Sequence, residues 1–168
     1  FIGGKFSIKY NSILSNFMGL DSLNYIGNKF ELNVNVALSN FSGLNRLEFI
    51  GDSFLITFHG SLNSLEGLEN LDTIIGGLSI VTNLAGFSEL KYIGNSISLH
   101  DNYDLTSLKG LNKIDSIQGS LTIRNNYILE NLAGIDSLKF IGENLTLQDN
   151  YNLSYCSSEG ICNYLMNP

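Results

Sequence analysis

A short fragment returns seven times along this chain: an isoleucine, three spacers, two apolar residues separated by one residue, two more spacers and then, usually, an asparagine. The first copy contains Ile2, Phe6, Ile8 and Asn11. Successive copies begin 24 residues apart, except for one interval of 19, at Ile2, Ile26, Ile50, Ile74, Ile93, Ile117 and Ile141. Such a period is typical of a solenoid, in which each repeat is one coil that buries its apolar face only by stacking on its neighbours.

The spacing inside a repeat predicts the path of each coil. The apolar pair has period 2, as in Leu121 and Ile123, which indicates a short strand with alternate side chains facing a core. After the asparagine the period becomes 3, which fits neither a helix nor a continuous strand, so we expect extended pieces joined by tight bends. Glycines such as Gly134 and Gly142 mark two corners per coil. We therefore predict an all-β-rich repeat fold, a right-handed β-solenoid of six to seven coils of about 24 residues.

One column of the repeat is polar. Three residues after the apolar pair stand six asparagines and one histidine, namely Asn11, Asn35, His59, Asn83, Asn102, Asn126 and Asn150. A carboxamide has two donors and an acceptor, so at an inward bend it can satisfy main-chain groups of its own coil and of the next. We interpret the column as a structural ladder of hydrogen bonds.

The 168 residues fit one domain, with coils over residues 1–155 and a C-terminal cap over residues 156–168. Because Phe1 falls in the middle of a repeat, we interpret the sequence as a piece of a longer or processed chain. Ile161 and Leu165 predict a short helix over residues 158–166 that faces the core. Cys156 and Cys162 either form a disulfide in an oxidising compartment or remain two buried thiols.

Composition and motifs argue against several functions. The net charge of −7 and the absence of a basic stripe disfavour nucleic acid and anionic membranes as partners. No apolar run approaches the ~18 residues that span a bilayer. His59 and His100 have no neighbouring nucleophile motif, and Glu31 is the one acid among seven outward strand positions, so neither acyl-transfer nor glycosidase chemistry is expected. We expect a protein that is not an enzyme and has no cofactor or metal.

The repeat Gly110-Leu111-x2-Ile114-x2-Ile117-x-Gly119-x-Leu121-x-Ile123-x2-Asn126 resembles the receptor L-domain family and, more loosely, leucine-rich repeats. The resemblance runs from Ile2 to about Cys162. It implies a capped solenoid, secreted or displayed at the cell surface, that binds protein or carbohydrate through its faces without catalysis. The ending after Leu153, and the lack of any cysteine before Cys156, resemble most the surface or secreted members from Bacteroidetes-like bacteria.

Two features predict a binding surface on the repeat. Tyr103, Tyr127 and Tyr151 each follow a ladder asparagine, so three rings should line one edge near the ~4.8 Å strand separation. Exposed aromatic rows suit sugars or protein partners, although each ring alternatively covers only its own corner. Leu55 and Phe58 occupy positions that are polar in later coils, which indicates either an exposed apolar patch or packing beneath a preceding segment.

A third feature is the repeat of 19 residues. The chain from Asn83 to Phe87 is five residues shorter than its neighbours, so two core columns are lost on one side. This predicts a notch, unless the loop was trimmed without consequence. The whole pattern favours a non-catalytic extracellular recognition or adhesion module, with a cell-envelope spacer that has no specific ligand as the alternative.

Overall fold

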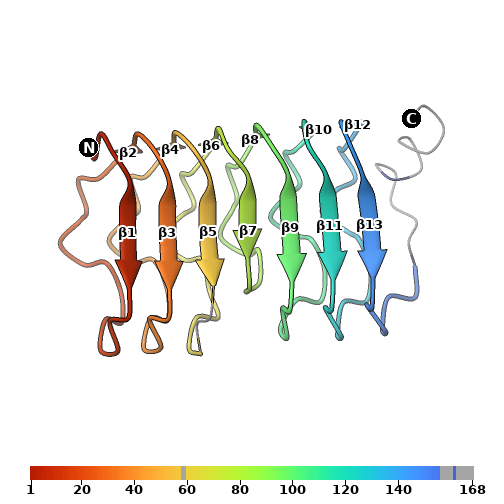
Figure 1. Ribbon diagram of the computed structural model, residues 1–168, viewed down its shortest axis with the longest axis horizontal. Helices are drawn as coiled ribbons and strands as arrows, with labels where there is room; N and C mark the ends of the chain where they lie inside the picture. Colours follow the sequence, from red (N-terminus) through yellow and green to blue (C-terminus); the bar gives the residue numbers. More distant parts are fainter. Residues whose placement is uncertain (58–59, 156–160, 162–168) are drawn as a thin grey trace.

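The computed structural model describes residues 1–57, residues 60–155 and Ile161. Over these residues the chain is a parallel β-solenoid of about six turns, which confirms the predicted repeat fold (Figure 1). The coils follow one another in chain order, with β1 (Phe6–Lys9) at one end and β13 (Leu145–Gln148) at the other. Almost all hydrogen bonds between coils therefore join residues one repeat apart.

The larger sheet takes one strand from each repeat, in chain order. Figure 1 shows these strands side by side, and the register places equivalent residues opposite each other, so that Leu121 lies between Ile97 and Leu145. The strands are β1 (Phe6–Lys9), β3 (Phe30–Asn33), β5 (Phe54–Thr57), β7 (Leu78–Ile80), β9 (Ile97–His100), β11 (Leu121–Arg124) and β13 (Leu145–Gln148).

The smaller sheet is built from two-residue strands that carry the isoleucine column. They are β2 (Tyr25–Ile26), β4 (Phe49–Ile50), β6 (Thr73–Ile74), β8 (Tyr92–Ile93), β10 (Ser116–Ile117) and β12 (Phe140–Ile141). The short repeat keeps its register in both sheets, because Ile74 pairs with Ile93 and Leu78 pairs with Ile97. Its five missing residues are therefore absent from a corner and not from a strand. We call residues 78–96 the short coil.

The core lies between the two sheets and consists of the apolar columns that the period predicts. Leu121 and Ile123 are fully buried, whereas Thr122 between them is partly exposed. In the N-terminal coils, phenylalanines stack along the solenoid axis, with Phe30 and Phe54 only 4.8 Å apart between ring centroids. Leucine and isoleucine take these places in the C-terminal coils. Burial of whole columns compensates for coils that are individually too small to have a core.

Glycine is required at the two predicted corners for two different reasons. Gly134 has a φ of +116°, and an added Cβ would lie 2.1 Å from the carbonyl oxygen of Leu108 in the preceding coil. At Gly142 an added Cβ would lie 2.0 Å from the carbonyl oxygen of Gln118. The backbones of adjacent coils thus approach too closely for any side chain at these positions.

A third corner follows the long strand and contains the asparagine ladder. The residue before each described ladder asparagine has a left-handed backbone, at Tyr10, Val34, Asp101, Asn125 and Asp149. The Oδ1 atom of Asn126 accepts hydrogen bonds from the main-chain N–H and the Nδ2 of Asn102, at 3.1 and 2.9 Å, and Asn126 Nδ2 donates to the carbonyl oxygen of Leu99. In the same way, Asn150 Oδ1 accepts from the main-chain N–H and the Nδ2 of Asn126, and Asn35 Oδ1 accepts from those of Asn11. These bonds offset the cost of a left-handed residue.

Asn83 does not belong to this ladder, contrary to the spacing argument. Its Oδ1 accepts a hydrogen bond from the N–H of Ala85 at 3.0 Å, as Asn131 Oδ1 does from Ala133. Asn131 lies at the corner after the ladder, so Asn83 occupies that later corner. Counting from the strand fails here because the short coil omits the ladder corner itself. His59, the expected ladder residue of the preceding coil, lies outside the described residues.

The C-terminal cap is described only at Ile161, which is buried. The predicted helix over residues 158–166, the side chain of Leu165 and the pairing of Cys156 with Cys162 lie outside the described residues. Within the part of the chain that the structure describes, no helix has the length and apolar character needed to cross a membrane.

Candidate functional site

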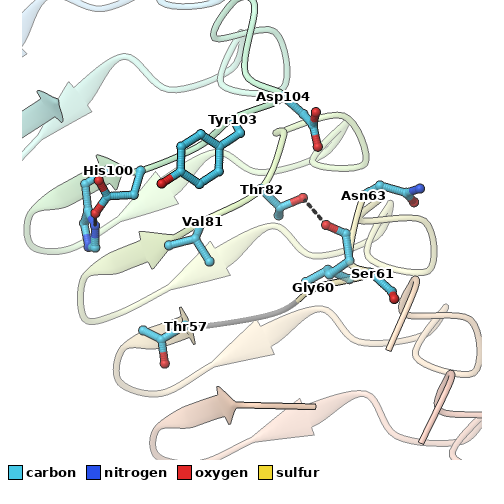
Figure 2. A pocket seen from close by; sticks show the side chains of 11 residues that line it. Thr57, Gly60, Ser61, Asn63, Val81, Thr82, His100, Tyr103 and Asp104 are labelled. Atoms are coloured by element: carbon cyan, nitrogen blue, oxygen red, sulfur yellow. Dashed lines mark hydrogen bonds and ion pairs between the residues drawn. The ribbon is translucent and has the colours of Figure 1, made fainter. Parts of the chain in front are cut away.

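The omitted corner of the short coil leaves a groove of about 1150 Å³ at the edge of the larger sheet. This is the place where the 19-residue repeat predicts a notch. Figure 2 shows that the side chains around it come from three successive coils. The lining residues are Thr57, Gly60, Ser61, Leu62 and Asn63 from the coil before, Val81 and Thr82 from the short coil, and His100, Asp101, Tyr103 and Asp104 from the coil after.

Hydrogen bonds hold the short coil against the coil before it. Thr82 is buried, and its Oγ1 donates to the carbonyl oxygen of Leu62 at 3.1 Å (Figure 2). Asn83 Nδ2 donates to the carbonyl oxygen of Asn63. These two side-chain hydrogen bonds hold the main chain on this side of the groove in place, and they give the carbonyl groups of Leu62 and Asn63 a partner.

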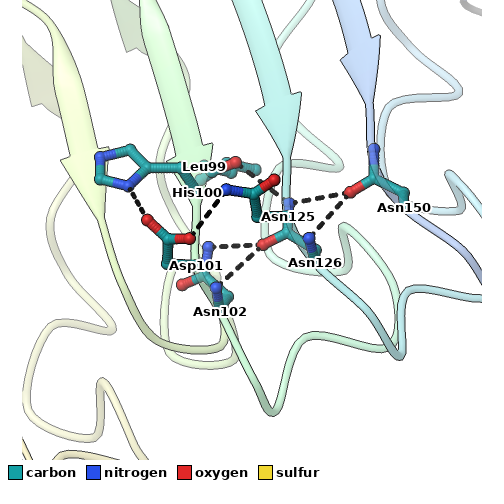
Figure 3. A network of polar contacts seen from close by, with 7 residues as sticks. All are labelled: Leu99, His100, Asp101, Asn102, Asn125, Asn126 and Asn150. Carbon is teal, nitrogen blue, oxygen red and sulfur yellow. Dashed lines mark hydrogen bonds and ion pairs between the residues drawn. The ribbon is translucent and has the colours of Figure 1, made fainter.

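One end of the groove contains a polar network that is also bonded to the next coil. His100 Nδ1 lies 3.0 Å from Asp101 Oδ2, and Asn125 Nδ2 donates to Asp101 Oδ1 at 3.0 Å (Figure 3). The hydrogen bond to His100, followed by the one from Asn125, holds the pKa of the Asp101 carboxyl below its ordinary value. Asp101 is thus a carboxylate whose two oxygens are both engaged.

The other end carries polar groups without such partners. The side chains of Asp104, Asn63 and Ser61 form no hydrogen bond or ion pair with any residue that the structure describes, and all three residues are exposed. No lysine or arginine is among the described residues that line the groove. The groove therefore offers acceptors, one amide and a hydroxyl, with a negative rather than a positive charge.

The ladder is interrupted beneath this site. In each regular coil, the Oδ1 of the asparagine accepts hydrogen bonds from the coil before it, but Asn102 follows the short coil, which has no ladder corner. Asn102 Oδ1 is buried and has no hydrogen-bond partner among the residues that the structure describes, and Figure 3 shows it directed away from Asn126. An orphaned buried acceptor costs roughly 1–3 kcal/mol. The groove thus coincides with a break in the hydrogen-bond ladder.

The tyrosine row, Tyr103, Tyr127 and Tyr151, begins at the groove and runs along the following corners. The ring centroids of Tyr103 and Tyr127 are 6.2 Å apart with a 40° tilt, and those of Tyr127 and Tyr151 are 5.5 Å apart and nearly parallel. Both spacings exceed the expected strand separation. Tyr127 is 41% exposed against 68% and 77% for its neighbours, because its two faces are turned toward them. The middle of the row presents ring edges and hydroxyls.

Tyr103 differs from the other two rings because it also lines the groove. No ladder corner, and hence no further ring, precedes it in the short coil. Figure 2 shows its ring face-on above Val81 and Thr82, with the hydroxyl directed toward the side where His100 lies. Tyr103 therefore joins the tyrosine row and the groove into one continuous surface.

The expected apolar patch is described only in part. Leu55 is partly buried on the outward side of β5, where it pairs with Glu31 and Ser79. Val81 lines the groove, and Phe58 lies outside the described residues. Among the described members, Val81 and not Leu55 contributes to the groove.

Glu31, the acid on the outward face of the larger sheet, forms ion pairs with Lys5 and Lys9, and hydrogen bonds from these lysines lower its pKa to about 2. Such a carboxylate remains ionised and is a poor general acid. Over residues 1–57 and 60–155, no three His, Cys, Asp or Glu side chains gather as metal ligands would.

The groove contains Tyr103, which the repeat pattern singles out, and also Asp104, Asn63, Ser61 and Thr57, which it does not. The length of the short repeat could have indicated these residues, because they belong to the coils on either side of it. Comparisons of this chain with protein-family models, with curated proteins and with solved structures each give no match.

Proposed function

We infer that this protein is a non-catalytic recognition module, which binds its partner at the surface formed by the groove and the tyrosine row. The observation that carries this proposal is the continuity of the two features at Tyr103, which lines the groove and stacks toward Tyr127. Tyrosine rings on a rigid frame supply contact area with little loss of conformational entropy, and their hydroxyls supply directional hydrogen bonds.

The resemblance of the repeat to receptor L domains supports a setting outside the cell, as a secreted or surface protein similar to those of Bacteroidetes-like bacteria. Two continuous parallel sheets hold the corners that carry the groove and the row. The surface is thus preorganised, which reduces the cost of binding. A cell-envelope spacer would need the same rigid frame but would make no use of the exposed rings.

The proposal is tested by retention on immobilised cell-envelope extract from the organism that encodes the protein. The triple variant Tyr103→Ala, Tyr127→Ala, Tyr151→Ala should lose most of the retention of the wild type while its melting temperature falls by only a few degrees. Tyr92→Ala is the matched control, because Tyr92 is 42% exposed but lies on the smaller sheet. Equal retention of the triple variant, or no retention of the wild type, would favour the spacer.

A further inference from the structure

We propose that the groove at the short coil binds a neutral sugar residue of a glycan, which stacks on the groove side of the Tyr103 ring. This proposal rests on the recognition function above and names its ligand class. Four observations carry it: the orientation of the aromatic faces, the unpaired polar groups, the sign of the charge and the shape left by the missing corner.

The aromatic faces select Tyr103 from the row. A sugar ring places its C–H groups against the face of an aromatic ring, not against its edge. Tyr127 and Tyr151 stack on each other at an interplanar angle of 4°, so that Tyr127 has a ring on each side. Tyr103 lines the groove, and the residue is 68% exposed. Tyr151 is 77% exposed and has a described ring on one side only, so it also offers a face, but Tyr103 is the member of the row that lines the groove together with Asp104 and Asn63.

The polar groups beside this ring suit hydroxyls. Asp104 can accept from two donors, while Asn63 offers both a donor and an acceptor, and neither side chain has a partner among the described residues. A sugar carries neighbouring hydroxyls that each donate and accept. Asp101 is already engaged with His100 and Asn125, so we assign it the role of positioning the groove wall next to Tyr103.

The charge narrows the class of sugar. Asp101 and Asp104 line the groove, and its described lining has no lysine or arginine. A uronic acid, a sialic acid or a phosphorylated sugar would place its own negative charge beside these carboxylates, and among the described lining residues only a protonated His100 could offset it. A neutral residue avoids this repulsion and still uses the acceptors.

The shape of the groove fits one part of a glycan chain. The groove lies where one corner is missing, and its described lining residues come from the short coil and from the coils before and after it (Figure 2). We place one residue of the glycan in the groove and the adjoining part of the chain along the hydroxyls of the tyrosine row.

The test uses the same envelope extract in three forms: untreated, oxidised with periodate and digested with protease. Periodate cleaves the carbon–carbon bond between neighbouring hydroxyls and so destroys sugar residues of this kind, whereas protease leaves them intact. We expect periodate to abolish retention of the wild-type protein and protease to leave it. Retention that survives periodate but not protease would overturn the sugar proposal in favour of a protein partner and leave the recognition function standing. No retention on any extract would overturn both.

The residue assignment is tested by affinity electrophoresis in mannan, laminarin and galactan, with polygalacturonate as the acidic comparison. At least one neutral polysaccharide should retard the wild type, and polygalacturonate should not. Tyr103→Ala and Asp104→Asn should each weaken binding about tenfold or more. Tyr103→Phe keeps the ring and should stay within a few-fold of the wild type. Tyr92→Ala and Asp115→Asn are the exposed controls.

Because Asp104 has no described partner, Asp104→Asn keeps this test valid even if Tyr103→Ala folds poorly. Thermal melting followed by circular dichroism checks each variant. Wild-type binding by Tyr103→Ala and Asp104→Asn, or no retardation of the wild type by any of the neutral polysaccharides, would overturn the assignment of the groove.

Discussion

The three coils from Ile97 to Asn150 and the short coil before them share the same two sheets but differ at one corner. In the regular coils, Asn102, Asn126 and Asn150 form a continuous ladder. In the short coil that corner is missing, yet Leu78 still pairs with Ile97. Strand pairing and corner chemistry are therefore separable in this fold. A coil can lose a corner, stay in register and leave a groove between its neighbours.

The difference also separates stability from binding. The regular corners are saturated with hydrogen bonds, and their rings cover each other. At the short coil, Asn102 Oδ1 is left without a partner, and the groove side of Tyr103 is left open. Functional surfaces often coincide with such local departures from an otherwise consistent pattern.

The largest expected effect comes from breaking the ladder in the regular coils. Asn126→Ala removes the acceptor for two donors of Asn102 and the donor to Leu99, so the free energy of unfolding should fall by roughly 3 kcal/mol. Asn83→Ala should cost less than about 1 kcal/mol, because Asn83 lies at a different, partly exposed corner. Urea denaturation followed by circular dichroism measures both.

Asn102→Ala refines this comparison. It removes the same kind of side chain as Asn126→Ala, but it also removes the orphaned oxygen, so its cost should be smaller than that of Asn126→Ala. A loss at Asn83 as large as at Asn126 would show that Asn83 is a ladder residue after all.

The second prediction restores the missing corner. A copy of residues 101–105 inserted between Val81 and Thr82 lengthens the short coil to 24 residues and supplies donors to Asn102 Oδ1. The free energy of unfolding should rise by roughly 1–2 kcal/mol, and polysaccharide binding should disappear because the groove is filled. Denaturation and affinity electrophoresis measure the two effects on the same protein.

A five-residue Gly/Ser insertion at the same point is the control, since it adds length without ladder chemistry. It should give no gain in stability. If the copied corner destabilises the protein as much as this linker does, the short coil does not lack the ladder corner.

The smallest effect concerns the wall of the groove. Asp101 has a lowered pKa in the folded protein, so its contribution to stability is present above the ordinary carboxyl pKa and is lost as the pH falls through the folded value. Asp101→Asn should cost less than about 1 kcal/mol at neutral pH, because the side chain is 45% exposed. The difference from the wild type should shrink in acid, as measured by thermal melting across pH.

Asp149→Asn is the matched control for Asp101, because Asp149 precedes a ladder asparagine at the same corner but contacts only Gln148 through its side chain among the described residues. The same pH dependence for both variants would contradict the role given to His100 and Asn125.

The sequence by itself determined the solenoid, the long strand of each coil, the apolar columns and two kinds of glycine corner. The physical reason is that each coil stacks on its neighbours in the same way. Strand alternation, core spacing and close backbone contacts therefore require the same residue types at the same position of every repeat. The place of the five-residue gap along the chain was equally visible. Asn102, Asn126 and Asn150 could be assigned from their column for the same reason.

Only the tertiary structure decided which residues lie around the short coil, where the period is broken. Spacing alone placed Asn83 in the ladder, whereas the hydrogen bond from Ala85 places it at the next corner. The orientation of the tyrosine rings, the free groups of Asp104 and Asn63 and the orphaned oxygen of Asn102 depend on contacts between three coils. A periodic pattern specifies what repeats, and the contacts across its single break follow from how the neighbouring coils fit together in space.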